Sequence, residues 1–220
     1  MKISKRIQKI IEYIDVNDNV ADIGCDHGYL GLGCLEKGIK FIQNIDNKIG
    51  PLNTAKKNLS KYEDNDNVIY TLCDGLDALD NRVDTVVISG MGGDLITQII
   101  NRNLEKAKNL KKIIVVAHSK LFLLRKELTN NFTIIDEGII EEKNKYYEII
   151  ILKPGFNNEY NYEDFLLGPI LKLNKNDLFF NKWNKRLNEL NNILEQINNP
   201  ELFIQKQTIE QNIKSVNFKS

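Results

Sequence analysis

The chain has 220 residues, with 30 Lys and Arg against 30 Asp and Glu, so its formal net charge is zero. This balance excludes a global positive charge that would point to nucleic acid, and any such partner must be bound by local basic patches. The length predicts one α/β domain with an appendage, and no apolar run is long enough to cross a membrane.

The cysteines are too few and too far apart for a structural framework. Cys25, Cys34 and Cys73 form no Cys-x-x-Cys pair, so we expect neither a metal site nor disulfide bonds. The basic residues that begin the chain are not followed by the apolar core of a signal peptide. We therefore expect a cytoplasmic protein without a membrane partner. We also expect it to be a monomer.

The first half of the chain alternates between strand and helix patterns. Apolar residues at helical spacing predict a helix over Ile7–Ile14. The elements expected next are a strand ending near Asp22, a helix from Tyr29, a strand over Phe41–Asp46, a helix over Pro51–Leu59 and a strand over Val68–Leu72. Strands that alternate with helices in this way are typical of a parallel sheet.

The second half continues this alternation and ends in a hairpin. It predicts strands over Val83–Ile88 and Ile113–Ala117, helices from Asp94 and over Leu121–Leu128, and closing strands over Phe132–Glu141 and Tyr146–Leu152. The polar turn of residues 143–145 joins the last two strands. The predicted fold class is α/β, with a doubly wound, mostly parallel sheet of seven strands that includes one antiparallel strand.

The composition changes at Pro154-Gly155, after which the chain is first polar and then helical. Two apolar stripes, each with two residues per heptad, flank the break at Asn198-Asn199-Pro200. Their members are Trp183, Leu187, Leu190, Leu194 and Ile197, then Leu202, Ile209, Ile213 and Val216. We expect an antiparallel helical hairpin, similar to a coiled coil, and domains at residues 1–155 and 156–220. The hairpin either packs on itself or on the sheet domain, or it binds nucleic acid.

Residues 20–29 contain a strand, a glycine-bearing turn and a helix start, the unit that brings backbone close to a nucleotide-like ligand. The turn Gly24-Cys25-Asp26-His27-Gly28 is a poor dinucleotide fingerprint, because a carboxylate stands where a pyrophosphate would lie. A sulfonium ligand with an ammonium group would instead be attracted, which favours S-adenosylmethionine over a nicotinamide dinucleotide. The alternative is that both glycines are ordinary turn residues.

Polar residues or glycines follow four predicted strands at their carboxyl ends, where open α/β sheets bind ligands. Asp46 is placed to bind both hydroxyls of a ribose. Asp74 could accept a hydrogen bond from an adenine amino group, although Asp-Gly is also a common turn pair. Residues 90–93 have little side-chain bulk. They could lie beneath a flat acceptor base, or they could allow a helix to pack closely on the strand. The expected cofactor-binding residues are Asp22, Gly24, Cys25, Asp26, His27, Tyr29, Asp46, Asp74, Gly75, Gly90 and Met91.

These motifs resemble those of the bacterial tRNA (adenine(22)-N1)-methyltransferase family. The matching stretches are Lys2–Ile7, Ala21–Leu30, Gly50-Pro51, Asp74–Leu76, Ile88–Ile96, Glu141–Ile149, Leu167–Leu171 and the helix around Trp183. The resemblance covers nearly the whole chain. It implies a Rossmann-like class I methyltransferase domain, a helical C-terminal domain, S-adenosylmethionine as donor and tRNA as acceptor. The alternatives are a methyltransferase of another RNA or a small molecule, and a non-catalytic RNA-binding module.

Two positions depart from the family pattern. Asp46 stands where relatives commonly have Glu, and Val116-Ala117-His118 replaces the usual Gln-Pro-Asn. His118 either substitutes for a lost polar group or is simply solvated.

The chemistry of the implied reaction needs no strong base, because N1 of adenine carries a free lone pair at neutral pH. Methylation leaves the ring positively charged, and a nearby carboxylate would stabilise that charge. Asp26, with His27 beside it, is the candidate for this catalytic role. The alternative is that Asp26 caps the following helix.

Three groups of basic residues could contact tRNA phosphates, although each could equally be a solvated face. They are Lys2, Lys5, Arg6 and Lys9; Lys106, Lys108, Lys111 and Lys112; and Lys182, Lys185 and Arg186.

Overall fold

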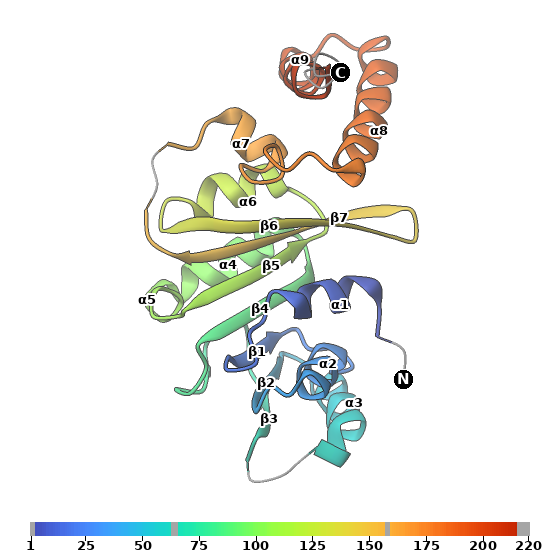
Figure 1. The fold of residues 1–220 in the computed structure, drawn as a ribbon. Helices are drawn as coiled ribbons and strands as arrows, with labels where there is room; N and C mark the ends of the chain where they lie inside the picture. Colours follow the sequence, from blue (N-terminus) through green and yellow to red (C-terminus); the bar gives the residue numbers. More distant parts are fainter. Residues whose placement is uncertain (1–2, 63–65, 157–158, 215–220) are drawn as a thin grey trace.

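The computed structural model describes residues 3–62, 66–156 and 159–214 (Figure 1). The strands are β1 (Asn19–Ile23), β2 (Phe41–Asp46), β3 (Val68–Leu72), β4 (Thr85–Met91), β5 (Lys112–Ala117), β6 (Phe132–Glu142) and β7 (Lys145–Pro154). The helices are α1 (Lys5–Glu12), α2 (Tyr29–Lys37), α3 (Ile49–Leu59), α4 (Gly93–Arg102), α5 (Leu104–Lys108), α6 (Leu121–Leu128), α7 (Tyr162–Leu167), α8 (Asp177–Leu194) and α9 (Pro200–Lys214), with a 3-10 turn at Ser60–Tyr62.

The strands form one seven-stranded sheet in the order β3-β2-β1-β4-β5-β7-β6. Strands β1 to β5 pair in parallel, whereas β7 runs antiparallel to both β5 and β6. The predicted doubly wound sheet with one antiparallel strand is therefore confirmed. The chain reverses its direction of winding between β1 and β4, which opens a crevice at the carboxyl ends of these strands.

Helices cover both faces of the sheet, and alternate residues of each strand serve the two faces. On β4, Val86 and Ile88 belong to the core beneath α4 and α6, whereas Val87 belongs to the core beneath α1 and α2. Figure 1 shows α4 and α5 on one side of the sheet and α1 on the other. Burial on both faces explains why the central strands are almost continuously apolar.

The predicted start of the fourth strand at Val83 is wrong. Val83 is buried, but its N–H closes a turn by donating to the carbonyl of Asp80 at 3.0 Å. The strand begins at Thr85 and continues to Met91, with its register against β5 shifted between Ser89 and Met91. An apolar side chain can thus be buried without its backbone joining the sheet.

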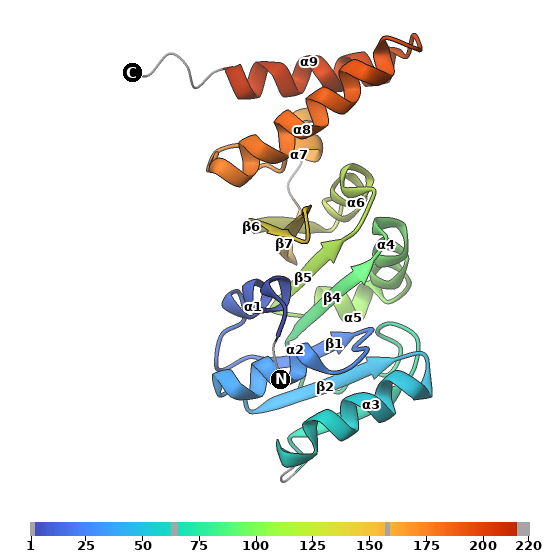
Figure 2. The same cartoon turned by 90° about the vertical axis from the view of Figure 1, so that its right-hand side faces the viewer.

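Helices α8 and α9 form the expected hairpin, crossing at an incline beyond β6 and β7 (Figure 2). Trp183 and Leu190 on α8 and Ile209 on α9 are buried. Their cluster also includes Ile139 of β6, so the hairpin packs both on itself and on the sheet. Ile197 does not belong to this interface, because α8 ends at Leu194 and Ile197 is 50% exposed. The predicted stripe residue Val216 lies outside the described residues.

A buried ion cluster joins the helical hairpin to the sheet. Arg125 of α6 is fully buried and donates to Glu137 Oε1 through Nε at 2.9 Å and Nη2 at 2.7 Å. Its Nη2 also donates to Glu148 at 2.5 Å, and Lys182 of α8 pairs with the same Glu148 carboxylate. The expectation that Lys182 could contact tRNA phosphates is therefore wrong. Its charge is used inside the protein, where breaking a buried pair typically costs about 3–5 kcal/mol.

The basic group that precedes β5 is also largely structural. Lys112 is 7% exposed and pairs with Asp15 at 2.9 Å and Asp18 at 2.8 Å. Lys111 pairs with Asp18 at 2.6 Å, and Lys106 donates to backbone carbonyls. These lysines hold the chain around the start of β5 and are not a free phosphate-binding patch.

Candidate functional site

Three parallel strands end side by side at one edge of the sheet. Ile23 of β1 is in register with Ile45 of β2 and with Ile88 of β4. The residues that follow these three positions are Gly24, Asp46 and Ser89, so they are neighbours although they are distant in sequence. The sequence pattern placed ligand-binding residues at this edge, where open α/β sheets bind their ligands.

The turn after β1 needs glycine at position 24. Gly24 has φ of +75°, and the N–H groups of Gly24 and Cys25 both donate to the carbonyl of Ile45, at 2.8 Å and 3.0 Å. A Cβ at Gly24 would lie 2.4 Å from the terminal carbon of Met91. The bare backbone thus lets the turn approach the end of β4.

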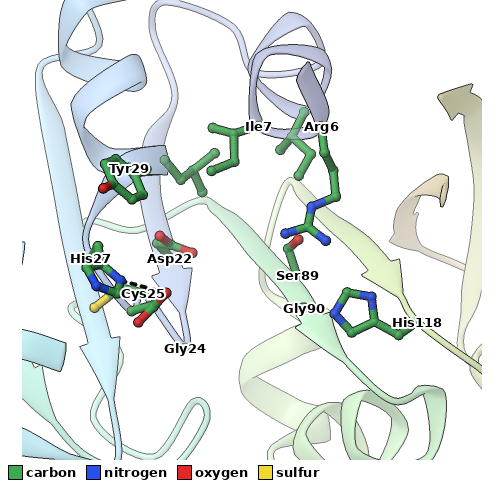
Figure 3. Close-up of a pocket in the computed structure, with 13 residues that line it drawn as sticks. Arg6, Ile7, Asp22, Gly24, Cys25, His27, Tyr29, Ser89, Gly90 and His118 are labelled. Atoms are coloured by element: carbon green, nitrogen blue, oxygen red, sulfur yellow. Dashed lines mark ion pairs between the residues drawn. The ribbon is translucent and has the colours of Figure 1, made fainter. Parts of the chain in front are cut away.

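Two cavities of about 320 Å³ each lie on either side of this turn, and both are lined by Gly24, Ser89 and Gly90. The first cavity contains the predicted residues Asp22, Gly24, Cys25, Asp26, His27, Tyr29 and Gly90 (Figure 3). The second contains the predicted residues Gly24, Asp46, Asp74, Gly75, Gly90 and Met91. Every predicted cofactor-binding residue therefore lines one of two adjoining cavities.

Asp26 and His27 lie together on the rim of the first cavity. Asp26 adopts a left-handed conformation with φ of +47°, and its carboxylate lies 2.7 Å from Nδ1 of His27. The Asp26 side chain is 71% exposed. Helix α2 has Gly28 as its N-cap, with no side-chain hydrogen bond at the cap, so the alternative of Asp26 as the helix cap does not hold.

Asp22 lies deeper in the same cavity and is 6% exposed. Burial raises the pKa of its carboxyl group to about 7, and the nearby Asp46 and Asp26 add to this effect. A carboxyl group with this pKa loses its proton readily when a cation binds beside it. The cavity is therefore suited to an ammonium group.

The raised pKa of Asp22 predicts that binding of S-adenosylmethionine strengthens with pH. Below a pKa of about 7 the carboxyl group must release a proton before it can pair with the donor's ammonium group, so Kd should be roughly tenfold weaker at pH 5.5 than at pH 7. Calorimetry over this range tests the expectation. The Asp22→Asn variant is the control, and it should bind more weakly with a flatter dependence on pH. An equally steep dependence in that variant would assign the effect to another group.

The wall of the first cavity opposite the turn comes from α1, which sequence reasoning missed. Ile7 and Ile10 line it, and the Arg6 guanidinium points into it toward Ser89 (Figure 3). Arg6 Cζ lies 4.9 Å from the centre of the Tyr147 ring, and Arg6 Nε is buried without a hydrogen-bond partner among the described residues. The sequence placed Arg6 in a basic group with Lys2, which lies outside the described residues.

His118 completes the first cavity on the side of β5. Its backbone N–H donates to the carbonyl of Met91 at 2.9 Å, which fixes the loop after β5 against the end of β4. Its ring meets the Tyr147 ring edge-on, with centroids 5.7 Å apart. Burial, together with the Arg6 charge, lowers the pKa of His118 below its ordinary value. His118 lines the first cavity and is also exposed to solvent, so the structure is compatible with both interpretations from the sequence.

The second cavity has the features of a nucleoside site. Asp46 stands at its edge, and one carboxylate oxygen accepts a hydrogen bond from the N–H of Lys48 at 2.9 Å. Apolar side chains line the remainder, among them Ile45, Pro51, Leu95 and Ile99. A flat base can pack between such side chains while the Asp46 carboxylate faces hydroxyl groups.

Asp74 is less free than the sequence suggested. Its Oδ2 accepts a hydrogen bond from Arg102 Nη1 at 2.7 Å, and its backbone carbonyl accepts one from Arg102 Nη2 at the same distance. The carboxylate is 52% exposed and lines the second cavity. Only its other oxygen remains for the adenine amino group that the sequence assigned to it.

A wider groove of about 970 Å³ runs from His118 along β7 to α8. Lys120, Lys145 and Lys185 line it with exposed side chains, and the aromatic residues along it include Phe122, Tyr146 and Tyr147. Lys120 pairs with Asp94, and Lys185 donates to the carbonyl of Asn144 at 3.4 Å. The groove joins the first cavity at His118, so a long ligand could occupy both.

Within the described residues, no group of three or more His, Cys, Asp or Glu side chains is arranged to hold a metal ion. In the same part of the chain, no helix is both long enough and apolar enough to cross a membrane.

Comparisons with known proteins by sequence and by structure find the same family. The family model for tRNA (adenine(22)-N(1))-methyltransferase, TrmK, matches residues 20–218. The tRNA (adenine(22)-N(1))-methyltransferase of Bacillus subtilis (strain 168) is 32% identical over 207 residues, covering 90% of this chain and 86% of that protein.

Two solved structures that are similar to this chain contain S-adenosyl-L-methionine or its product S-adenosyl-homocysteine. Sp1610 of Streptococcus pneumoniae, in complex with S-adenosyl-L-methionine, has a TM-score of 0.88 and 29% identity, covering 96% of this chain and 100% of the other. TrmK of M. capricolum, in complex with the cofactor product S-adenosyl-homocysteine, has a TM-score of 0.82 and 25% identity, covering 99% of both chains.

Proposed function

The chain belongs to the tRNA (adenine(22)-N(1))-methyltransferase family, and we propose that it transfers the methyl group of S-adenosylmethionine to N1 of adenine 22 in tRNA. The observation that carries this proposal is the pair of adjoining cavities that share Gly24, Ser89 and Gly90. A donor nucleoside in the second cavity can extend its methionine part past Gly24 into the first. An acceptor base that enters the first cavity then lies beside the donor's sulfonium group.

The residues present fit the donor in three ways. Asp46 faces the ribose hydroxyls, and the apolar lining of the second cavity suits adenine. Asp22 and Arg6 place opposite charges in the first cavity, matching the ammonium and carboxylate groups of methionine. Gly24, which has no side chain, lines both cavities and lets the donor extend from one into the other.

The reaction is a displacement at carbon. Bound S-adenosylmethionine supplies a methyl group activated by its sulfonium. The N1 lone pair of adenine forms the new C–N bond as the C–S bond breaks, and the C–S electron pair stays on sulfur. Positive charge moves from sulfur to the adenine ring. Asp26, which lines this cavity, is placed to stabilise the charge on the ring, and His27 holds the Asp26 carboxylate at 2.7 Å.

The groove from His118 to α8 is the proposed binding surface for the rest of the tRNA. Cations along a groove bind phosphates, and aromatic rings stack with unpaired bases. N1 lies on the Watson–Crick edge, so adenine 22 must leave any pairing before it reaches the first cavity. An RNA bound in the groove would reach that cavity from the side of α8. The proposed role of residues 156–220 is therefore to recognise the tRNA.

Replacing Lys120, Lys145 and Lys185 together by Ala is expected to weaken tRNA binding and to reduce its dependence on salt. Each lost phosphate contact should lower the slope of log K against log salt by roughly 0.7–0.9. Filter binding at several salt concentrations measures both effects. The control replaces Lys56, Lys57 and Lys61, which are exposed at the far end of the sheet. Equal losses in both triple variants would mean that the groove has no special role.

The same proposal places the protein in the cytoplasm, because tRNA is its substrate. We also propose that one chain is the working unit.

Nucleoside mass spectrometry of tRNA incubated with the protein and S-adenosylmethionine tests the activity. The expected result is N1-methyladenosine, formed in equal amount with S-adenosylhomocysteine. Methylation of another nucleoside would favour a methyltransferase of different specificity. Binding of tRNA and cofactor without any transfer would favour a non-catalytic RNA-binding module.

A further inference from the structure

Arg102, the last residue of α4, holds Asp74 at the edge of the second cavity. Its Nη1 donates to Asp74 Oδ2 and its Nη2 donates to the Asp74 backbone carbonyl, both at 2.7 Å. The planar guanidinium thus binds the side chain and the main chain of one residue together, which fixes the direction of the carboxylate. Asp74 lines the second cavity. Because Arg102 occupies Oδ2, Oδ1 is the oxygen that can meet a ligand there.

Asp74 lies where the base of a bound donor would end. The N–H of Cys73 donates to the carbonyl of Asp46 at 3.1 Å, so Asp74 follows directly beside the end of β2. A donor whose ribose lies at Asp46 would extend its base along Leu95 and Ile99 of α4, which line the same cavity. The amino group on the edge of adenine is a hydrogen-bond donor, and a carboxylate oxygen only accepts.

We propose that Arg102 is a positioning residue for the donor: it orients the Asp74 carboxylate so that Oδ1 accepts a hydrogen bond from the 6-amino group of adenine. The inference rests on the proposed function and adds to it the residue that makes the second cavity select adenine. A base with an oxygen at this position would face the carboxylate oxygen and find no hydrogen to share. Arg102 can only donate, so it acts through Asp74 and not on the base itself.

The neighbours of Arg102 keep its guanidinium in this position. Asp77 Oδ1 lies 3.3 Å from Arg102 Nη2, and Asn103 donates to the same oxygen at 2.8 Å. Gly75 has φ of +61°, and a Cβ there would lie 3.2 Å from Arg102 Nη2 and 2.8 Å from a methyl carbon of Ile99. The Asp-Gly pair after β3 is therefore more than a turn, because the aspartate supplies the acceptor and the glycine lets the guanidinium approach.

The loop that carries Asp74 has other anchors, so Arg102 is not needed to keep it folded. Leu76 is fully buried, and Lys106 donates to its carbonyl at 3.2 Å. The side chain of Gln43 holds a carbonyl later in the loop, at 2.9 Å. The Arg102 side chain is 46% exposed, and exposed ion pairs contribute little to stability. Removing the guanidinium should therefore free the Asp74 carboxylate to turn while the loop stays in place.

The test compares two ligands by calorimetry in the wild type and in variants of Arg102. The ligands are S-adenosylhomocysteine and its analogue with purine in place of adenine, which lacks only the amino group. The wild type should bind S-adenosylhomocysteine about tenfold to a hundredfold more tightly than the analogue. Arg102→Gln should lose most of this preference. Arg102→Lys should lose most of it too, because an ammonium group keeps the charge but lacks the planar fork that fixes the carboxylate.

Arg82→Gln is the matched control. Arg82 makes the same kind of pair, with Nε 2.8 Å from Asp80 Oδ1 and Nη2 2.9 Å from Asp80 Oδ2, and its side chain is 49% exposed. Neither residue of this pair lines the second cavity. The control should keep the wild-type preference for S-adenosylhomocysteine, and all the variants should unfold close to the Tm of the wild type.

A preference in Arg102→Gln that equals or exceeds the wild-type value would overturn the role of Arg102. Equal affinity of the wild type for both ligands would show that the amino group is not recognised and would also overturn the inference. An equal loss of preference in Arg82→Gln would contradict it, because the effect would not depend on Asp74. Failure of the wild type to bind S-adenosylhomocysteine at all would instead overturn the proposed function, so the two failures can be told apart.

Discussion

The Asp26→Asn variant is expected to methylate tRNA about a hundredfold more slowly than the wild type while keeping its fold. The reason is electrostatic, because the adenine ring becomes positive as the methyl group moves and Asp26 is an exposed carboxylate on the rim of that cavity. Asn keeps the shape of the side chain and tolerates the left-handed backbone of this position, but it removes the charge. Single-turnover rates at saturating donor and tRNA measure the effect.

Asp66→Asn is the matched control for Asp26. Asp66 also has a left-handed backbone, with φ of +58°, and it is exposed away from both cavities. Its replacement should leave turnover unchanged. If Asp26→Asn instead melts at a lower temperature and keeps most of its turnover per folded molecule, the residue supports the turn and does not take part in the chemistry.

The Asp46→Ala variant is expected to bind S-adenosylmethionine about tenfold to a hundredfold more weakly. Asp46 lies at the end of β2 on the edge of the nucleoside cavity, and hydrogen bonds to a charged acceptor contribute about 1.5–3 kcal/mol. Calorimetry measures the loss. Asp46→Glu is the conservative control and should keep most of the affinity, since it restores a carboxylate on the same strand end. Unchanged affinity in Asp46→Ala would remove this residue from the pocket.

The sheet and one edge of the site could be predicted because they follow from local patterns. Short apolar runs identified the seven strands, and apolar residues at helical spacing or helix-start signals identified α2, α3, α4 and α6 between them. Parallel strands bring their carboxyl ends to one edge, so Gly24, Asp46 and Gly90 could be placed together without knowing any contact.

What the sequence could not supply are contacts between residues far apart in the chain. Arg6 on α1 reaches the first cavity because α1 packs beside β6 and β7, and its charge alone suggested a surface residue. Lys182 similarly looked like a free cation, yet the arrangement of α8 on the sheet brings it to Glu148. A lysine in a helical pattern has the same appearance in sequence whether its partner is a phosphate or a buried carboxylate.

The short helices show another limit. Helices α5 and α7 have five and six residues, which is too short for a periodic pattern to be distinguished from a loop. Helix α7 is instead defined by its capping box, in which Asn161 accepts from the N–H of Asp164 and the Asp164 side chain accepts from the N–H of Asn161.

We propose that the two adjoining cavities deliver a methyl group to a single nitrogen of a single nucleotide. The most direct test incubates the protein and S-adenosylmethionine with two tRNA transcripts that differ only at position 22, one with adenine and one with uridine. Position-resolved mass spectrometry then locates the methyl group. We expect one methyl group, on N1 of adenine 22, and none on the uridine transcript. Equal methylation of both transcripts, or a methyl group at another position, would contradict it.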